Sequence, residues 1–334
     1  MKWLITGGCG FIGRNLVKEL FEEGGHAIRI MDNLSVGSRE DLAQVCEFTE
    51  SDPDISSFPH TVLNTQSSIV ELITGDIIDD QVAIKLAKGV DVIVHLAANT
   101  GVGISVEDPR SDCINNVLGT FNYLEAARQN AVKRFVFASS GAPIGECEPP
   151  IHEELAPHPV SPYGASKLSG EAYCSAFYHS FGVETVALRF GNVYGPLSGH
   201  KNSVVAKFIR QAINGETLEI YGDGYQTRDF INIDDLVRAI RLSEHKPEIG
   251  GETFQIATNK ETSIMELVEL LIPILADFGY QNVNVEYKAP RVGDVRRNFS
   301  DTSKARKRLN WEAKAELSSG LQQIVKWYIE QKKE

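Results

Sequence analysis

The amino-acid sequence predicts an α/β fold with a mostly parallel sheet covered by helices on both faces. Short apolar runs alternate with helical patterns over the first 190 residues, as they do in such folds. A glycine-rich segment joins the first apolar run to the first helical pattern. The 334 residues are 42% hydrophobic and 23% charged, an ordinary globular composition.

The first expected strand covers residues 2–6, and the first helix covers residues 11–23. That helix carries Ile12, Leu16 and Leu20 on one stripe, and Gly24 with Gly25 ends it. Further strands are expected at residues 26–32, 71–76, 90–98, 134–140 and 184–190, and helices at residues 81–88 and 117–130.

Two regions depart from this rhythm. Residues 46–68 are polar, contain two prolines and are expected to form an inserted loop. Beyond Gly195 and Pro196 the pieces are shorter: a helix at 203–214, strands near 218–221 and 253–257, and helices from Ser263 and Leu317. We expect a first domain at residues 1–182 and a smaller mixed α/β lobe at 183–334, with the strand at 184–190 returning to the first sheet.

The net charge of −12, from 33 basic and 45 acidic residues, argues against nucleic acid or an anionic membrane as a partner. Five scattered cysteines predict neither disulfides nor a metal site, so a cytoplasmic location is expected. The sequence contains no run of about 18 apolar residues, so no membrane span is expected.

The spacing Gly7-x-x-Gly10-x-x-Gly13 places glycines where a strand meets a helix, so that backbone N–H groups can hold a pyrophosphate. Asp32 ends the second strand, 19 residues after Gly13, where a carboxylate accepts hydrogen bonds from ribose hydroxyls. Together they predict a Rossmann-type, doubly wound domain that binds NAD, and the carboxylate disfavours the 2′-phosphate of NADP. Alone, Asp32 and Asn33 also fit an Asx turn.

Other cofactor contacts are expected where later strands end. Small Ala97 and Ala98 let the cofactor lie close, whereas His95 is expected to be a hydrogen-bonded core histidine. The full expected cofactor set is Gly7, Gly10, Phe11, Ile12, Gly13, Asp32, Asn33, Asp76, Ile77, Leu96, Ala97, Ala98, Tyr163 and Lys167.

Tyr163 and Lys167 are four residues apart, so on a helix they share a face. A lysine ammonium there is expected to lower the phenol pKa and make Tyr163 a base for a substrate hydroxyl. Ser140, at the end of a strand, adds a hydroxyl at the same edge of the sheet. These three residues are the expected catalytic set.

The chain resembles the extended short-chain dehydrogenase/reductases of the NAD-dependent nucleotide-sugar epimerase/dehydratase family. The likeness runs from TGGCGFIG through HLAA, NNVLGT, YGASK and LRFGNVYGP to YGDGYQTRDFINIDD and RVGDVRR. It implies a nucleoside-diphosphate sugar substrate. It also implies that Tyr163 is the base, that Lys167 holds the nicotinamide ribose, that Ser140 bonds the reacting hydroxyl, and that Asn116 supports the active-site helix or simply packs there.

The same resemblance implies a set of substrate-binding residues, among which Arg228 and Arg291 supply local positive charge for a diphosphate. The full expected set is Thr100, Ser140, Asn192, Arg228, Arg291, Asp294 and Asn298. A homodimer is implied through the helices that start near Asn116 and Tyr163. Their outer faces carry Phe121, Leu124, Tyr173 and Phe177, which fit the core equally well.

The residues after Ser140 bear on the reaction. Dehydratases of this family carry an Asp-Glu pair where this chain has Gly141 and Ala142, and the related decarboxylases have Glu at the position of Ala142. The resemblance therefore implies epimerisation of a UDP-sugar at C4 through a 4-keto intermediate, in the UDP-glucose/UDP-galactose or the N-acetylated pair. A UDP-glucuronate 4-epimerase, a decarboxylase or a reductase stays open. Gly103 stands where uronate epimerases often carry Arg, and Asn298 is intermediate in size at a position that limits the sugar.

Overall fold

The structure is a computed structural model and describes residues 1–53, 67–290 and 295–332. The chain divides into two compact units. The first contains residues 1–145, 153–189 and 237–254, and the second contains residues 146–152, 190–236 and 255–334. Residues 237–254, which the sequence places in the C-terminal lobe, thus belong to the first unit.

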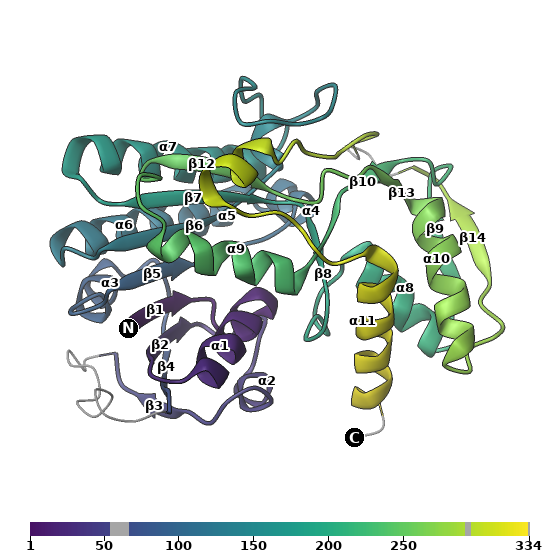
Figure 1. Cartoon of the computed structure of the whole chain (residues 1–334), viewed down its shortest axis with the longest axis horizontal. Coiled ribbons are helices and arrows are strands. Elements are labelled where there is room, and N and C mark those ends of the chain that lie inside the picture. The colour runs from purple at the N-terminus through teal and green to yellow at the C-terminus, as the bar shows by residue number, and fades with distance from the viewer. Residues whose placement is uncertain (54–66, 291–294, 333–334) are drawn as a thin grey trace. The chain divides into compact units, whose positions relative to one another are not determined.

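The first unit is built on an eight-stranded sheet with the strand order β12-β7-β6-β5-β1-β2-β4-β3 (Figure 1). Its strands are β1 (Lys2–Thr6), β2 (Ala27–Asp32), β3 (Thr49–Ser51), β4 (Ile69–Thr74), β5 (Val92–His95), β6 (Arg134–Ser140), β7 (Thr185–Phe190) and β12 (Glu252–Ile256). The pairs β1–β2, β1–β5, β2–β4, β3–β4 and β5–β6 are parallel. The predicted α/β class with a parallel sheet is confirmed.

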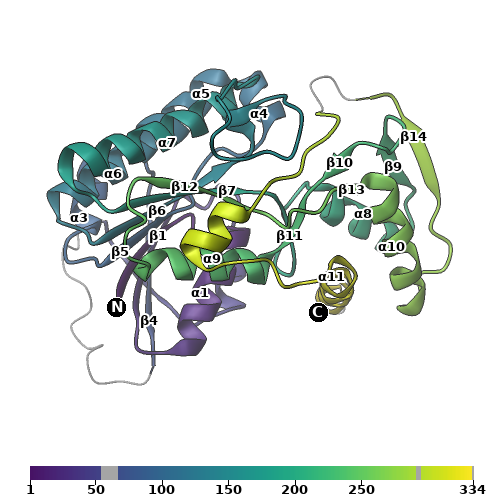
Figure 2. The ribbon, with the colours of Figure 1, turned by 45° about the horizontal axis from the view of Figure 1, so that its top comes forward.

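Helices cover both faces of this sheet (Figure 2). They are α1 (Phe11–Glu23), α2 (Arg39–Ala43), α3 (Asp80–Leu86), α4 (Val102–Glu107), α5 (Pro109–Cys113), the π-helix η2 (Ile114–Leu118), α6 (Gly119–Gln129), the 3-10 helix η3 (Ala142–Ile144), α7 (Pro162–Phe181) and the larger part of α9 (Ile233–His245). α3, α6 and α7 lie on one face, and α1 and α9 on the other. The expected bounds of β1, α1 and β6 are confirmed.

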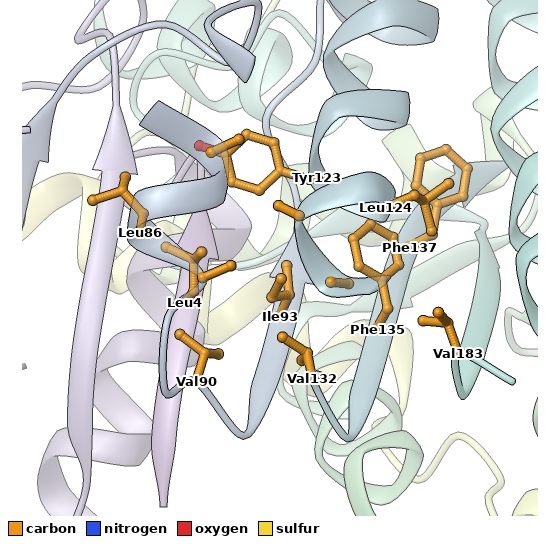
Figure 3. Close-up of a cluster of buried hydrophobic side chains, with 14 of the residues drawn as sticks. Leu4, Leu86, Val90, Ile93, Tyr123, Leu124, Val132, Phe135, Phe137 and Val183 are labelled. Carbon is orange, nitrogen blue, oxygen red and sulfur yellow. The ribbon is translucent and has the colours of Figure 1, made fainter. Parts of the chain in front are cut away.

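The core between the sheet and α3, α6 and α7 is apolar (Figure 3). Ile93 and Phe135 project from the sheet, and Leu86 and Tyr123 meet them from the helices. Leu124 and Phe177 belong to this same core. Of the two alternatives that the sequence leaves open for them, an outer helix face and the core, the structure shows the core.

The expected loop at residues 46–68 is wrong in one part, because Thr49–Ser51 forms the edge strand β3. Residues 54–66 lie outside the described residues. β5 is also shorter than expected, since the chain turns away from the sheet after His95. There the backbone N–H groups of Leu96 and Ala97 donate to Thr6 Oγ1.

The second unit holds three two-stranded sheets: β8 (Asn192–Tyr194) with β11 (Phe230–Asn232), β9 (Leu218–Tyr221) with β14 (Val285–Lys288), and β10 (Thr227–Arg228) with β13 (Thr262–Ser263). Its helices are α8 (Val204–Ile213), α10 (Ile264–Asp277), the π-helix η4 (Ala305–Leu309) and α11 (Leu317–Gln331). Ser263 caps α10 through a capping box with Glu266. Phe208, Leu267 and Leu321 lie in the core that these elements share.

Candidate active site

The glycine loop between β1 and α1 has the geometry of a phosphate cradle. Gly7 has a φ of +71°, and a Cβ on Gly13 would lie 2.3 Å from the Gly7 carbonyl oxygen, so neither position tolerates a side chain. α1 begins after Gly10 with no side-chain cap and no acidic residue in its first turn. The positive end of the helix dipole therefore suits an anion, and this loop fits the pyrophosphate of a dinucleotide.

Asp32 lies buried at the carboxyl end of β2, beside this loop. Its Oδ2 accepts the Cys9 N–H at 2.9 Å, and its Oδ1 accepts the Leu34 N–H at 2.9 Å in an Asx turn. Burial raises the pKa of Asp32, while these two hydrogen bonds act in the opposite direction. A carboxylate has about four acceptor positions, so the turn leaves acceptor capacity for ribose hydroxyls.

The remaining cofactor candidates follow the ends of neighbouring strands. Asn33 Nδ2 donates to Asp76 Oδ2 at 3.4 Å, which links the ends of β2 and β4. Ala97 lies against Gly7, because a Cβ on that glycine would be 2.8 Å from the Ala97 nitrogen. Asn33, Asp76 and Ala97 thus lie at the edge of the sheet where the sequence predicts contacts with NAD.

His95 is enclosed in the core. One ring nitrogen lies 2.9 Å from Thr6 Oγ1 and the other lies 3.2 Å from Thr120 Oγ1. Burial lowers the pKa of His95 to about 3, so the ring is neutral. The expected role of a hydrogen-bonded core histidine, not a catalyst, matches this geometry.

Tyr163 and Lys167 share one face of α7, and Ser140 ends β6 beside them. The Lys167 Nζ donates to the Ala138 carbonyl at 2.9 Å and lies 5.9 Å from the centre of the Tyr163 ring. Burial lowers the pKa of Lys167 to about 8. The structure thus brings the three expected catalytic residues together.

The expected lowering of the Tyr163 pKa is not what this structure shows. Burial raises the pKa of Tyr163 to about 12, while hydrogen bonding with Ser140 lowers it and the charge of Asp112 raises it further. Desolvation of the phenolate is therefore the largest of these effects. The sequence spacing shows only that Tyr163 and Lys167 share a face, and it carries no information on this burial.

Asn116 supports α7 from the π-helix η2. Its Nδ2 donates to the Asn99 carbonyl, to Asp112 Oδ1 and to Ser166 Oγ, and its Oδ1 accepts the Asn99 N–H at 2.8 Å. A short π-helical segment next to an α-helix is often found at a functional site. Asp112 and Ser166 are missed by the sequence reasoning, and only their spacing from Asn116 and Lys167 could have indicated them.

In the second unit, Asn192 and Arg228 line one pocket of about 290 Å³ together with Asn202, Lys207 and Tyr221. The Lys207 Nζ lies 4.8 Å from the centre of the Tyr221 ring and pairs with Glu219. Arg228 Nη1 donates to the Val295 carbonyl at 2.8 Å.

The other expected substrate residues are placed as follows. Asn298 is half-buried, and its N–H donates to Thr227 Oγ1 at 3.4 Å. Thr100 is exposed in the first unit, after β5. Arg291 and Asp294 lie outside the described residues.

A dinucleotide cradle with an acidic residue after the second strand, together with a Ser, Tyr and Lys set, defines the NAD-dependent short-chain dehydrogenase/reductase class. The model of the NAD dependent epimerase/dehydratase family matches residues 3–257, and the chain belongs to that family. Its cofactor is NAD. No helix in the described parts of the chain is long and apolar enough to cross a membrane.

Three solved structures resemble the whole chain. UDP-glucose 4-epimerase of Thermotoga maritima with UDP-glucose is 34% identical, with a TM-score of 0.86 and 99% of each chain covered. UDP-N-acetylglucosamine 4-epimerase of Methanobrevibacter ruminantium, in complex with UDP-N-acetylmuramic acid, is 31% identical, with a TM-score of 0.85 over 99% of this chain and 98% of that one. UDP-glucuronic acid 4-epimerase of Bacillus cereus, with UDP-glucuronic acid and NAD, is 28% identical, with a TM-score of 0.85 over 99% and 100%.

Proposed function

We propose that this protein epimerises a UDP-sugar at C4 by transient oxidation to a 4-keto sugar. The observation that carries the proposal is the Ser140, Tyr163 and Lys167 set beside a turn that offers no acid. Gly141 and Ala142 occupy the positions where elimination or decarboxylation would require carboxylates, and a Cβ on Gly141 would meet open space.

Bound NAD supplies a reversible hydride acceptor for C4 and a positive ring charge that favours the phenolate. Tyr163 accepts the O4 proton as the C4–H bond is broken, and Ser140 hydrogen-bonds the same oxygen. The Lys167 ammonium stabilises the negative phenolate. After the 4-keto sugar turns over, Tyr163 returns the proton to O4 and the inverted alcohol forms, so the cycle has no net oxidation.

The sugar that we propose is neutral: glucose and galactose, or their N-acetylated counterparts. Gly103 on α4 has no side chain, and a Cβ built there meets no atom within 4 Å, so this position offers no cation to a sugar carboxylate. Ser105 gives no substitute, because it is buried and its hydroxyl donates to the Val102 carbonyl. The pocket of Asn192 and Arg228 is our candidate for the uridine diphosphate.

We also propose a homodimer, with α6 and α7 at the interface. Tyr173 is 38% exposed and Phe181 is 56% exposed, and both belong to a chain of edge-to-face aromatic contacts with Phe121 and Phe177. Sedimentation tests this state. A Tyr173→Glu variant should sediment as a monomer if the interface is correct.

The test of the activity is product identification by NMR after incubation with UDP-glucose, UDP-N-acetylglucosamine and UDP-glucuronate. Formation of the C4 epimer with catalytic NAD supports the proposal, and a neutral sugar should react faster than the glucuronate. Loss of CO₂, loss of water from the sugar or a stoichiometric demand for NADH would contradict it. Tyr163→Phe should abolish the reaction.

A further inference from the structure

Three consecutive residues at the end of β6 meet three side chains spaced by four residues on α7. The Lys167 Nζ donates to the Ala138 carbonyl, Ser139 Oγ donates to Glu171, and Ser140 lies close enough to Tyr163 to lower its pKa. Side chains four apart share one helix face, so a single face of α7 supplies all three partners, in a different order from that of the strand residues. Two of these pairs contain the proposed catalytic residues. Ser139 and Glu171 have no part in the proposed chemistry.

Glu171 is held rigidly. Arg189 on β7 donates two parallel hydrogen bonds to its carboxylate, from Nε to Oε1 at 2.8 Å and from Nη2 to Oε2 at 2.7 Å. Ser139 Oγ adds a third bond, to Oε1 at 2.5 Å. All three side chains are buried. A buried, bidentate Arg–carboxylate pair fixes the position of the carboxylate as well as its charge, so Glu171 is a fixed acceptor for the Ser139 hydroxyl.

The bond from Ser139 ties Glu171 to the catalytic serine. Ser139 and Ser140 are neighbours, with Cα atoms about 3.8 Å apart, so a shift of one displaces the other. A displacement of about 1 Å at reacting groups can cost about 100-fold in rate. The interaction by which Ser140 lowers the pKa of Tyr163 depends on this placement.

We propose that Glu171, oriented by Arg189, is a positioning residue that holds Ser140 against Tyr163 through its bond to Ser139. The proposal rests on the proposed function, because the roles of Ser140 and Tyr163 come from there. It extends the site by a residue that touches neither cofactor nor sugar. Glu171 acts through the strand.

The chain contains a matched control. Thr185 on β7 is also a buried strand hydroxyl that bonds to α7, from Oγ1 to the Cys174 carbonyl at 2.7 Å. That bond joins strand and helix 11 residues beyond Tyr163, away from the catalytic set. Thr185→Val and Ser139→Ala each remove one such hydroxyl and leave the charges unchanged. A purely structural role predicts similar effects for the two variants.

The experiment compares wild type, Ser139→Ala and Thr185→Val by thermal melting and by kcat and KM for the UDP-sugar. We expect kcat of Ser139→Ala to fall by about tenfold to 100-fold with little change in KM, and Thr185→Val to keep the wild-type kcat. Ser139→Cys keeps the volume with a weaker donor and should lose less. Equal kcat for Ser139→Ala and Thr185→Val would overturn the proposal.

A second readout needs no substrate. The Tyr163 phenol is titrated in the NAD complex by NMR of ¹³Cζ-labelled tyrosine, with Tyr163→Phe to assign the signal. The charged groups near it, Lys167 on α7 and Asp112 on α5, are unchanged in every variant. Ser139→Ala should raise the Tyr163 pKa, because the hydrogen bond that lowers it is weakened.

The two readouts separate the two proposals. If wild type epimerises no UDP-sugar and the Tyr163 pKa still rises in Ser139→Ala, the proposed function fails and the positioning role stands. An unchanged Tyr163 pKa in Ser139→Ala, with wild type active, refutes the positioning role alone.

Discussion

Replacing Lys167 by Met removes one buried positive charge beside Tyr163. The ammonium lies 5.9 Å from the centre of the Tyr163 ring. With an effective dielectric constant of about 20, a charge at this separation stabilises the phenolate by about 3 kcal/mol. That energy corresponds to about two pKa units. Lys167→Met should therefore lower the phenolate population, and kcat at neutral pH, by about 100-fold.

The assay is the pH dependence of kcat, measured by product NMR. Wild-type activity should level off above pH about 8, where the Lys167 ammonium loses its proton while the Tyr163 phenolate fraction still rises. The variant has no such group, so its activity should keep rising with pH and its deficit should shrink. Lys133→Met, at an exposed surface lysine, is the control. A deficit that stays constant at every pH would refute the electrostatic reasoning.

Thermal melting separates this loss from unfolding. Folding lowers the pKa of Lys167 from 10.5 to about 8, so the unfolded chain binds that proton more tightly between these pH values. Wild-type stability should therefore rise through this window, and the charged lysine destabilises the fold at neutral pH. The Tm of Lys167→Met at pH 7 should be no lower than that of wild type.

Three further outcomes are expected. Gly13→Ala places a Cβ 2.3 Å from the Gly7 carbonyl oxygen, so calorimetry should find NAD binding lost and the Tm lowered. An affinity for NAD equal to that of wild type would show that this loop does not hold the pyrophosphate. Burial lowers the pKa of His95 to about 3, so the free energy of unfolding, measured in urea, should fall below pH 6.5 by up to about 1.4 kcal/mol per pH unit. His95→Gln should lose this pH dependence. A slope in His95→Gln equal to that of wild type would show that another group causes it. In Gly103→Arg the new side chain enters open space on α4. KM for UDP-glucuronate should fall by about tenfold, because an ion pair with the sugar carboxylate adds about 1.4 kcal/mol of binding free energy. An unchanged KM would show that Gly103 is not part of the sugar site.

Strong local patterns made much of the first unit predictable. The apolar run of β1, the glycines after it and the stripe of α1 each point to one structure, and their bounds agree with the sequence. The positions of the candidate cofactor residues could be predicted because parallel strands end at a common edge of the sheet. The spacing of Tyr163 and Lys167 likewise predicts a shared helix face.

Features that depend on tertiary context were not predictable. β3 is three residues long and largely exposed, so its sequence carries no apolar signal. Phe121 and Leu124 lie on the same helix, and only the packing distinguishes the partly exposed ring from the core leucine. The pKa of Tyr163 depends on its burial. Glu171 stands four residues after Lys167, a spacing visible in the sequence, but its bonds to Ser139 and Arg189 require the fold.

The division of the chain into two units determines where a chimera with a relative can be joined. The second unit consists of three stretches, residues 146–152, 190–236 and 255–334, because the chain returns to the first unit at residues 153–189 and again, with most of α9 and the start of β12, at residues 237–254. A gene fragment ending at residue 189 encodes a sheet whose strand β7 lacks its neighbour β12, with an open edge that invites aggregation. A chimera that takes a new substrate specificity from a relative must therefore keep residues 237–254 with the NAD-binding unit, and its junctions belong near residues 146, 152, 190, 236 and 255.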